Sequence, residues 1–301
     1  MKAVVFTLGC KVNGCESASL LRGLEERGYE VSDELVPADL YILNTCAVTA
    51  EAEKKSRQAG ARIRAAPPQA RIYVCGCAAE RMPSQFAGKE GVRLVTGTMH
   101  KGGIPELLDE EGVRISPAET CFEELPSPRF LQTRAYVKVQ DGCNNFCSYC
   151  IIPYLRGRSR SRSLESAAAE ILSCPAEEVV ITGIDVSSYR DGARDLADLL
   201  RAVKDAKARI RLGSLETHAV TERLLAAAKE VRDFAPHFHL SLQSGSDAVL
   251  RAMNRKYTRA EFLRKAALVR EAFPSAALTT DIIVGFPTET EEDFEATLAL
   301  A

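Results

Sequence analysis

A short loop with three cysteines is the part of this sequence best suited to chemistry. Cys143, Cys147 and Cys150 follow one another with three and two residues between them, directly after the strand-like run Ala135–Val139. Three thiolates can hold one small inorganic centre, but they are one ligand short of a four-cysteine iron–sulfur site. A metal site with an open position is a reactive site, as the contrast between catalytic and structural zinc centres shows. The loop therefore predicts an iron–sulfur centre with one open position.

The same cysteines also fit a zinc site that lacks its fourth ligand, or a redox dithiol beside an unrelated cysteine. The twenty residues after Cys150 contain neither His nor Cys, so the local sequence does not complete a zinc set. The open iron–sulfur site is therefore the favoured interpretation.

The composition is that of an ordinary globular chain with room for two domains. It has 301 residues, 46% hydrophobic and 27% charged, and a domain core typically serves about 100 to 200 residues. With a net charge of −2, contact with nucleic acid would depend on local basic patches. Neither a signal peptide nor an apolar run of membrane-spanning length is recognisable, which predicts a cytoplasmic protein with no membrane partner. Ten cysteines in such a chain favour metal or redox use over disulfides.

Strand-like and helix-like segments alternate over residues 1–115 and predict an α/β domain with an open parallel sheet. The expected strands are Lys2–Leu8, Asp39–Asn44, Arg71–Cys75 and Val92–Val95. The expected helices are Glu16–Arg27, which ends at Gly28, and Thr49–Ala65, which ends at Pro67 and Pro68.

Three cysteines of this domain share one position relative to the strands. Cys10, Cys46 and Cys77 each follow a predicted strand, and the carboxyl ends of parallel strands meet at the edge of a sheet where ligands bind. A single cysteine there would be an ordinary buried residue, but the recurrence favours a second three-thiolate iron–sulfur site. Cys15 and Cys75 are better assigned to packing.

Residues 116–134 are predicted to link the two domains. They carry Pro117, Pro126 and Pro128 and show no sustained hydrophobic period. Cys121 in this segment matches no motif.

The alternation resumes over residues 135–301 and predicts a partial β/α barrel of the TIM type. The expected strands are Ala135–Val139, Glu178–Thr182, Arg209–Gly213, His237–Gln243 and Leu278–Val284. The expected helices are Leu164–Ser173, Leu196–Lys207, Thr221–Val231 and Arg259–Phe273. Because barrel chemistry lies at the carboxyl ends of the strands, the three-cysteine loop would occupy the active edge, together with Gly183, Glu216 and Gln243.

An arginine-rich stretch follows the three-cysteine loop. Arg156, Arg158, Arg160 and Arg162 lie beside Tyr154 and could grip a polyanion with an aromatic ring available for base stacking. Such a stretch can equally be a solvated loop, so RNA binding is only one of two readings.

Taken together, these motifs resemble the radical S-adenosylmethionine enzymes and, more narrowly, their methylthiotransferase family. The resemblance extends over nearly the whole chain, and it is carried by Thr7–Asn13 (TLGCKVN), Asn44–Cys46, Glu53–Gln58, Gly76–Cys77, Gln140–Pro153 (QDGCNNFCSYCIIP), Leu242–Asp247, Arg255–Thr258 and Asp281–Pro287.

The resemblance implies two [4Fe–4S] clusters and S-adenosylmethionine as cofactors. The cluster that cleaves S-adenosylmethionine would be held by Cys143, Cys147 and Cys150. The cluster that delivers sulfur would be held by Cys10, Cys46 and Cys77. The candidates for contact with S-adenosylmethionine are Gly183, Glu216 and Gln243.

Within the family, Cys10-Lys-Val-Asn13 is similar to the branch that adds a methylthio group to C2 of N6-threonylcarbamoyladenosine beside the tRNA anticodon. That activity implies tRNA, an external electron donor and a sulfur source as partners. The alternatives are a methylthiotransferase for isopentenyladenosine in tRNA or for a ribosomal protein and, in another class, a non-catalytic metal-binding RNA adaptor.

The chain departs from the family pattern in three places. Gly14 and Cys15 stand where other residues are usual, which leaves Cys15 as a spare thiol, and the stretch Ile184–Tyr189 diverges. The chain ends at Ala301, so the family pattern predicts a barrel truncated at its carboxyl end, without a sixth strand and a carboxyl-terminal RNA-binding domain.

Overall fold

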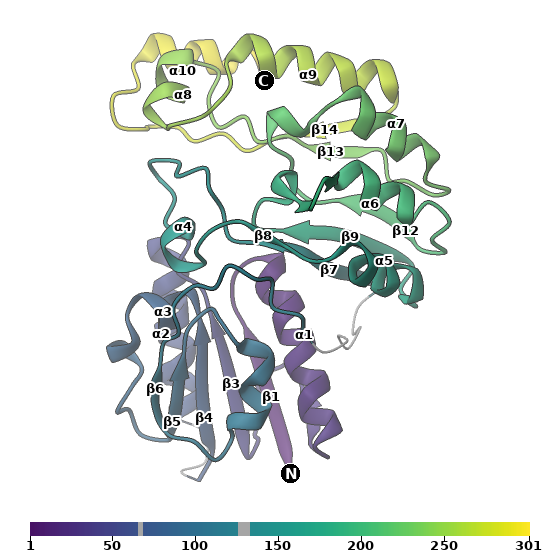
Figure 1. Ribbon diagram of the computed structural model, residues 1–301. Helices are drawn as coiled ribbons and strands as arrows, with labels where there is room; N and C mark the ends of the chain where they lie inside the picture. Colours follow the sequence, from purple (N-terminus) through teal and green to yellow (C-terminus); the bar gives the residue numbers. More distant parts are fainter. Residues whose placement is uncertain (66–68, 126–132) are drawn as a thin grey trace. The chain divides into compact units, whose positions relative to one another are not determined.

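The computed structural model describes residues 1–65, 69–125 and 133–301. The chain forms two compact units, each of which is described by itself (Figure 1). The first unit is Met1–Gln132 together with Tyr154–Arg158, and the second is Thr133–Pro153 together with Ser159–Ala301. A short segment that follows the three-cysteine loop therefore belongs to the amino-terminal unit.

The first unit is built on a six-stranded sheet in which every pair of neighbours is parallel. Its strands are β1 (Lys2–Thr7), β2 (Glu30–Ser32), β3 (Leu40–Thr45), β4 (Arg71–Gly76), β5 (Val92–Thr96) and β6 (Gly112–Arg114). Their order is β2-β1-β3-β4-β5-β6, so the direction in which strands are added reverses between β1 and β3. In open α/β sheets ligands bind at the carboxyl ends of the strands at this switch point.

Side chains of β3 alternate between two buried faces of the sheet. Leu40 and Ile42 belong to one core with Leu20 and Leu24 of α1 (Lys11–Glu26). On the other face Leu43 lies against Gly60 of α2 (Ala50–Arg64). Helix η2 (Lys101–Leu107) covers the same face as α1, through Ile104. Since each such aliphatic side chain contributes about 1.5–3 kcal/mol when buried, this alternation fixes the register of β3 and the direction of its carboxyl end.

The four strands predicted for this unit are confirmed, with ends shifted by about one residue. Two strands were not predicted, β2 and β6, because each has only three residues and no clear alternation. Helix α1 begins at Lys11 instead of Glu16, so Cys10 is its N-cap. The predicted helix stop at Pro67 and Pro68, and the linker residues Pro126 and Pro128, lie outside the described residues.

The second unit is a series of β/α steps. Strands β7 (Arg134–Asp141), β9 (Glu178–Gly183) and β12 (Arg209–Leu212) are parallel neighbours, and β8 (Arg160–Ser161) runs antiparallel beside β7. The parallel pair β13 (His237–His239) and β14 (Ala277–Thr279) continues the series, because isolated bridges join Ile210 to Phe234 and Leu215 to Leu240.

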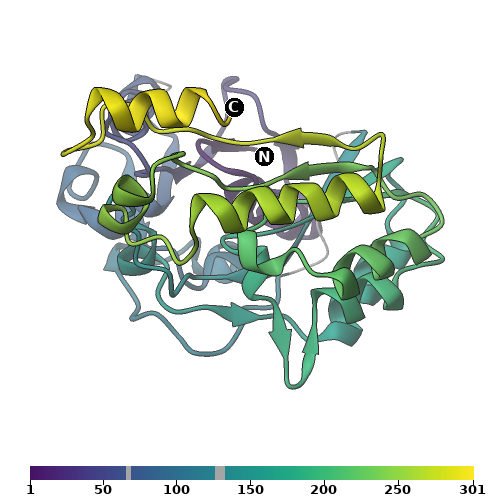
Figure 2. The same ribbon diagram turned by 90° about the horizontal axis from the view of Figure 1, so that it is seen from above.

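Helices connect the strands of this unit as predicted. They are α5 (Leu164–Ser173), α6 (Leu196–Ala202), α7 (Glu222–Glu230) and α9 (Arg259–Ala272). Figure 2 looks down on the unit and shows α9 and α10 (Glu291–Leu298) running beside the extended chain around β14. This is the expected partial β/α barrel.

The last two strands are shorter than predicted. His237–Gln243 and Leu278–Val284 form ladders over three residues each, and beyond His239 the residues Leu240 and Gln243 make isolated bridges. Gln243, the last residue of its predicted strand, adopts a left-handed φ of 68°. Short elements without a sustained period were not predicted: α3 (Cys77–Arg81), α4 (Ile152–Leu155), α8 (Asp247–Ala252) and the hairpin β10–β11 (Arg190–Asp195). None of the helices in the described parts of the chain has the length and apolar character needed to cross a bilayer.

The turn after β4 predicts a sharp effect of adding one methyl group. Gly76 has φ 95°, and a Cβ atom there would lie 2.5 Å from the carbonyl oxygen of Thr45 and 2.6 Å from Asn44 Oδ1. We expect Gly76→Ala to lower the free energy of unfolding by about 2 kcal/mol or more. Gly14 of α1 has open space around it, so Gly14→Ala should raise stability by about 0.5–1 kcal/mol. Urea unfolding of the metal-free chain measures both; equal effects of the two substitutions would contradict the crowding at Gly76.

Candidate active site

The three-cysteine loop lies at the carboxyl end of β7 in the second unit. Its backbone turns back on itself, because the amide of Cys150 donates to the carbonyl of Cys147 at 2.9 Å and Phe146 adopts a left-handed φ of 49°. The amide of Asn145 donates to Cys143 Sγ at 3.4 Å. The loop thus folds back on itself, with one of its amides bonded to the sulfur of Cys143.

The segment after α8 anchors one side of this loop. Asn254 donates from Nδ2 to the carbonyl of Phe146 at 2.9 Å, and Ser148 donates from its amide to the carbonyl of Met253 at 3.1 Å. The Ser148 hydroxyl also donates to the carbonyl of Ala252 at 2.9 Å. These bonds fix the loop on both sides of its second cysteine, at Phe146 and at Ser148.

Polar residues at the ends of β7 and β9 anchor the other side. Gln140 Oε1 accepts from the amide of Asp185 at 2.7 Å, and Gln140 Nε2 donates to the carbonyl of Gly142 at 2.7 Å. Asp185 Oδ2 in turn accepts from Asn145 Nδ2 at 3.1 Å. Gln140 is fully buried, so its hydrogen bonds compensate the cost of burying an amide.

The thiols of the loop lie close enough to influence one another. Burial raises the pKa of Cys143 to about 11, with smaller contributions from Asp185, Cys150 and Cys147. Burial, and then Cys147, also raises the pKa of Cys150, although a backbone bond and Arg255 oppose the shift. Thiols whose pKa is raised in the metal-free chain, as for Cys143 and Cys150, release their protons when a cationic centre binds them. The donor set therefore fits an iron–sulfur cluster.

Arg255 is a member of this site that sequence reasoning did not identify. It donates from Nη1 to Cys147 Sγ at 3.2 Å and from Nη2 to Glu216 Oε2 at 2.5 Å, with only 4% of its side chain exposed. Its guanidinium lies 5.0 Å from the ring centroid of Tyr257, whose hydroxyl donates to the carbonyl of Ser241 at 2.6 Å. The matching motif Arg255–Thr258 was the available signal, but nothing in it says which residue faces the cysteines.

Of the three residues expected to contact S-adenosylmethionine, Gly183 ends β9 and the other two follow strands, and each also has a structural role. A Cβ at Gly183 would lie 2.9 Å from Gln140, so close packing requires glycine there. Glu216 pairs with Arg255. The backbone of Gln243 accepts from Ile283 and donates to Asp281, at 2.9 Å each.

The second cysteine set lies at the switch point of the first unit. Cys10 follows β1 and is exposed, Cys46 follows the neighbouring strand β3 and is buried, and Cys77 is buried where α3 begins after β4. A Cβ at Gly9 would lie 2.8 Å from Cys46 Sγ, so the first two turns are in close contact. Burial raises the pKa of Cys46, and Cys77 and Cys10 raise it further. The structure thus gathers the three predicted thiols in one region.

Neither set is arranged for a single metal ion. Within residues 1–65, 69–125 and 133–301, no three Cys, His, Asp or Glu side chains converge on a point where one ion could be held. In a four-iron cluster each cysteine binds a different iron, so the sulfurs are spread around the cluster.

The remaining cysteines are structural or isolated. Cys75 lies inside β4 in the core, and burial raises its pKa to about 12. Cys15 and Cys174 are buried, and Cys121 is exposed.

The arginine-rich stretch needs a correction. Three of its four arginines are buried against carboxylates: Arg156 against Glu16, Arg160 against Asp141 and Arg162 against Glu170. A buried guanidinium that is already paired is not available to a phosphate group. Arg158 is exposed, as is Tyr154 with 74% of its surface accessible. Of the four arginines expected to bind a polyanion, Arg158 therefore remains a candidate, with the exposed Tyr154 near it.

Known protein families match both parts of the chain. Residues 137–301 match the Radical SAM superfamily, and residues 2–97 match the family described as Uncharacterized protein family UPF0004.

Several curated proteins match almost the whole chain. Threonylcarbamoyladenosine tRNA methylthiotransferase MtaB of Chlamydia pneumoniae is 44% identical over 97% of this chain and 70% of its own length. The protein with the same name from Bacillus subtilis is 38% identical over 99% of this chain and 70% of its own length. A tRNA-2-methylthio-N(6)-dimethylallyladenosine synthase of Alkaliphilus oremlandii is also 38% identical, over 99% of this chain and 68% of its own length.

Solved structures share the fold at low identity. The cobalamin-dependent S-adenosylmethionine radical enzyme OxsB, with aqua-cobalamin and S-adenosylmethionine bound, matches with a TM-score of 0.65 and 13% identity, over all of this chain and 52% of that one. The likeness supports the α/β architecture.

The Arg255–Glu216 pair predicts a pH-dependent loss of stability on substitution. Burial raises the pKa of Glu216, and the charge of Arg255 partly opposes this rise. Arg255→Met should lower the free energy of unfolding by about 3 kcal/mol at pH 8, because it leaves a largely buried carboxylate, 17% exposed, without its charged partner. The pKa of Glu216 is higher in the folded chain than in the unfolded chain. The contribution of its carboxyl to the free energy of unfolding is therefore complete at a pH below the unfolded-state pKa and is lost as the pH rises through the folded-state pKa. The deficit should therefore shrink towards pH 5.

Urea unfolding at both pH values checks this prediction. Arg251→Met, at an exposed position of α8, is the matched control and should change stability little at either pH. The same deficit for Arg255→Met at pH 5 and pH 8 would show that Glu216 is not the partner left unpaired.

Proposed function

We infer that this chain, which belongs to the radical SAM superfamily and within it to the tRNA methylthiotransferase family, adds a methylthio group to C2 of N6-threonylcarbamoyladenosine beside the anticodon of tRNA. The observation that carries the proposal is the presence of two separate three-thiol sets in one chain, each at the carboxyl edge of its own sheet. The choice of substrate is supported by the Chlamydia pneumoniae relative and by Cys10-Lys-Val-Asn13.

The enzyme uses S-adenosylmethionine and an iron–sulfur cluster, as members of its superfamily do. We propose two [4Fe–4S] clusters. The ligands of the first are Cys143, Cys147 and Cys150. The ligands of the second are Cys10, Cys46 and Cys77. When bound, these groups supply the one-electron chemistry that activates C2 of the adenine, and the sulfur and methyl group that replace its hydrogen.

The residues of the chain position and shield these groups. Gln140, Asp185 and Asn254 hold the three-cysteine loop in shape before any cluster is bound. Three thiolates leave one coordination position for S-adenosylmethionine, and Gly183, Glu216 and Gln243 stand at the same edge as its proposed contacts. Arg255 orients both Cys147 and Glu216, so it couples the proposed cluster ligands to the proposed cofactor contacts.

The domain assignment follows the same division of tasks. We propose residues 1–115 as the methylthiotransferase domain, 116–134 as the linker and 135–301 as the radical SAM barrel, with Tyr154–Arg158 packed in the amino-terminal unit. Arg158 and Tyr154 are the proposed RNA contacts in this region, since a guanidinium and an exposed ring suit phosphate binding and base stacking. We propose that the reaction also needs an external electron donor and a sulfur source, and that it takes place in the cytoplasm, where tRNA would be its substrate.

The second candidate substrate is the dimethylallyl-modified adenosine of tRNA, which is favoured by the Alkaliphilus oremlandii relative. Mass spectrometry of tRNA nucleosides from cells that lack the gene distinguishes the two substrates. We expect loss of the 2-methylthio form of N6-threonylcarbamoyladenosine and accumulation of its unmethylthiolated precursor. Loss of the dimethylallyl-derived nucleoside alone would overturn the assignment.

Two cysteines only five positions apart along α1 and its N-cap, Cys10 and Cys15, provide a test of the second cluster. After anaerobic reconstitution, the native chain should hold about eight irons and Cys10→Ala or Cys46→Ala about four, with cleavage of S-adenosylmethionine retained. Cys15→Ala should keep all eight irons. Iron analysis and product assay give the two readouts; equal iron loss in Cys15→Ala and Cys46→Ala would show that the ligand assignment is wrong.

A further inference from the structure

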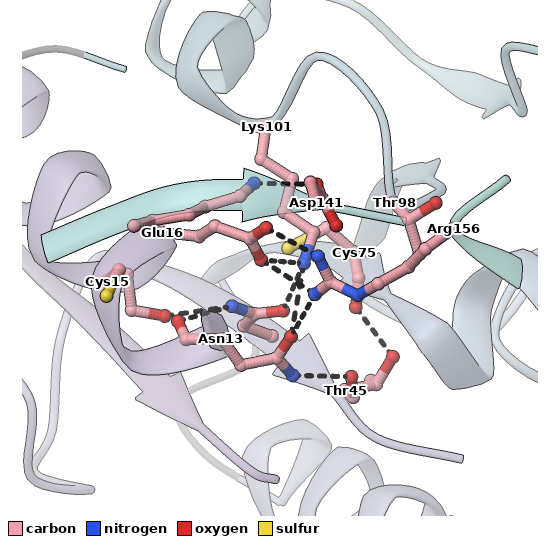
Figure 3. A network of polar contacts seen from close by, with 12 residues as sticks. Asn13, Cys15, Glu16, Thr45, Cys75, Thr98, Lys101, Asp141 and Arg156 are labelled. Carbon is pink, nitrogen blue, oxygen red and sulfur yellow. Dashed lines mark hydrogen bonds and ion pairs between the residues drawn. The ribbon is translucent and has the colours of Figure 1, made fainter. Parts of the chain in front are cut away.

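A buried network of polar and charged side chains in the amino-terminal unit includes Asn13, Glu16, Lys101 and Arg156 (Figure 3). Arg156 forms a two-pronged pair with Glu16, with Nη1–Oε1 at 2.8 Å and Nη2–Oε2 at 3.0 Å. Lys101 Nζ donates to the same carboxylate at 2.5 Å. The three side chains are at most 1% exposed. Because these side chains are buried away from solvent, a hydrogen bond that is lost cannot be replaced by one to water, and the geometry of the network is therefore fixed.

Asn13 connects this network to the backbone near two cysteines. Its Oδ1 accepts from Arg156 Nη2 at 2.7 Å, and its Nδ2 donates to the carbonyls of Leu8 at 2.8 Å and Thr45 at 3.0 Å. A guanidinium has donors but no acceptor, so Arg156 selects the amide orientation in which Nδ2 faces both carbonyls. Those carbonyls belong to the strand ends that lead into Cys10 and Cys46.

Thr45 extends the connection to the third turn. Its hydroxyl donates to the carbonyl of Cys75 at 2.6 Å and accepts from the amides of Ala78 and Ala79, both at 3.1 Å. Cys77 lies between these bonded residues. Two polar residues, Asn13 and Thr45, thereby join the three turns that carry the second cysteine set.

The segment that brings Arg156 into the unit is itself held there. Thr98 donates from Oγ1 to the carbonyl of Leu155 at 2.7 Å, and Leu155 and Arg156 are both buried. The neighbouring Arg158 is exposed. Within the segment Tyr154–Arg158, therefore, Arg156 is buried in the interior of the unit and Arg158 lies at its surface.

We propose that Arg156 and Asn13 are positioning residues for the second cluster: Arg156 orients the Asn13 amide, and the amide sets the spacing of the turns that present Cys10, Cys46 and Cys77. The proposal rests on the proposed function, since it assumes that this set binds a cluster. It adds that cluster binding depends on a residue contributed by the segment after the first three-cysteine loop.

Asn13→Asp is the sharpest variant, because Asp keeps the shape of Asn and its bonds to Arg156 but cannot donate to Leu8 and Thr45. The full chain is reconstituted anaerobically and its iron content and cleavage of S-adenosylmethionine are measured. We expect Asn13→Asp and Arg156→Met to fall from about eight to about four irons per chain while cleavage persists. Arg158→Met is the matched control and should keep all eight irons.

Hydrogen exchange of the metal-free chain gives a readout that needs no cluster. The amides of Ala78 and Ala79 should exchange at least about fivefold faster in Asn13→Asp than in the native chain, because the turn that holds Thr45 is loosened. Lys101 and Glu16 keep their bond in this variant, so global unfolding should change less than these two amides. If Arg156→Met fails to fold, Asn13→Asp still decides the question.

The outcomes separate the two levels of the proposal. Full iron content in Asn13→Asp, or iron loss in Arg158→Met equal to that in Arg156→Met, would overturn the positioning role. If the native chain itself binds only about four irons and Cys46→Ala loses none, the proposed second cluster fails, whatever the exchange rates show. Faster exchange at the amides of Ala78 and Ala79 with unchanged iron content would also overturn the positioning role, because the bonds of Asn13 would then stabilise the turns without being needed for cluster binding.

Discussion

The amide of Asn13 is the interaction on which the second cysteine set most depends. Ligands on three different strands keep a common spacing only if the strand ends are tied together beyond the sheet, where ladder hydrogen bonds stop. Asn13 ties two of these ends directly, and Thr45 ties the third. An amide can do this in one orientation only, and the fully buried Arg156 determines that orientation. The sheet sets the register of the strands, and the polar side chains then set the positions of the turns that carry the cysteines.

The fold was largely predictable from the sequence, because long strands and helices carry a strong hydrophobic period. Every predicted strand is found in the structure, and the three-cysteine loop and the second cysteine set lie at the expected strand ends. What the sequence did not reveal is set by contacts distant along the chain. The strand around Phe238 is predicted to reach Gln243 but ends at His239, because Leu240 and Gln243 make single bridges to two different segments of the chain.

The arginines show the same limit in another way. A row of arginines looks alike whether it faces solvent or carboxylates, and burial of Arg156, Arg160 and Arg162 depends on partners supplied elsewhere in the fold. Arg255 lies in the motif Arg255–Thr258, but the motif predicts no role for it, because only the fold brings it to Cys147. Charged residues are therefore where sequence reasoning failed most often here, since their partners decide what they do.

Both cysteine sets nevertheless use one physical device, a buried arginine paired with a glutamate: Arg156 with Glu16 and Arg255 with Glu216. The pairing offsets the charge and leaves other guanidinium donors free to orient a neighbour, which a lysine could do with less directional control. Arg255 donates directly to a cysteine sulfur, whereas Arg156 acts through an amide on the backbone. This difference suits the proposed tasks. Hydrogen bonds to sulfur tune the reduction potential of a cluster that must accept an electron, while a sulfur-delivering cluster bound from three strands depends first on the spacing of its ligands.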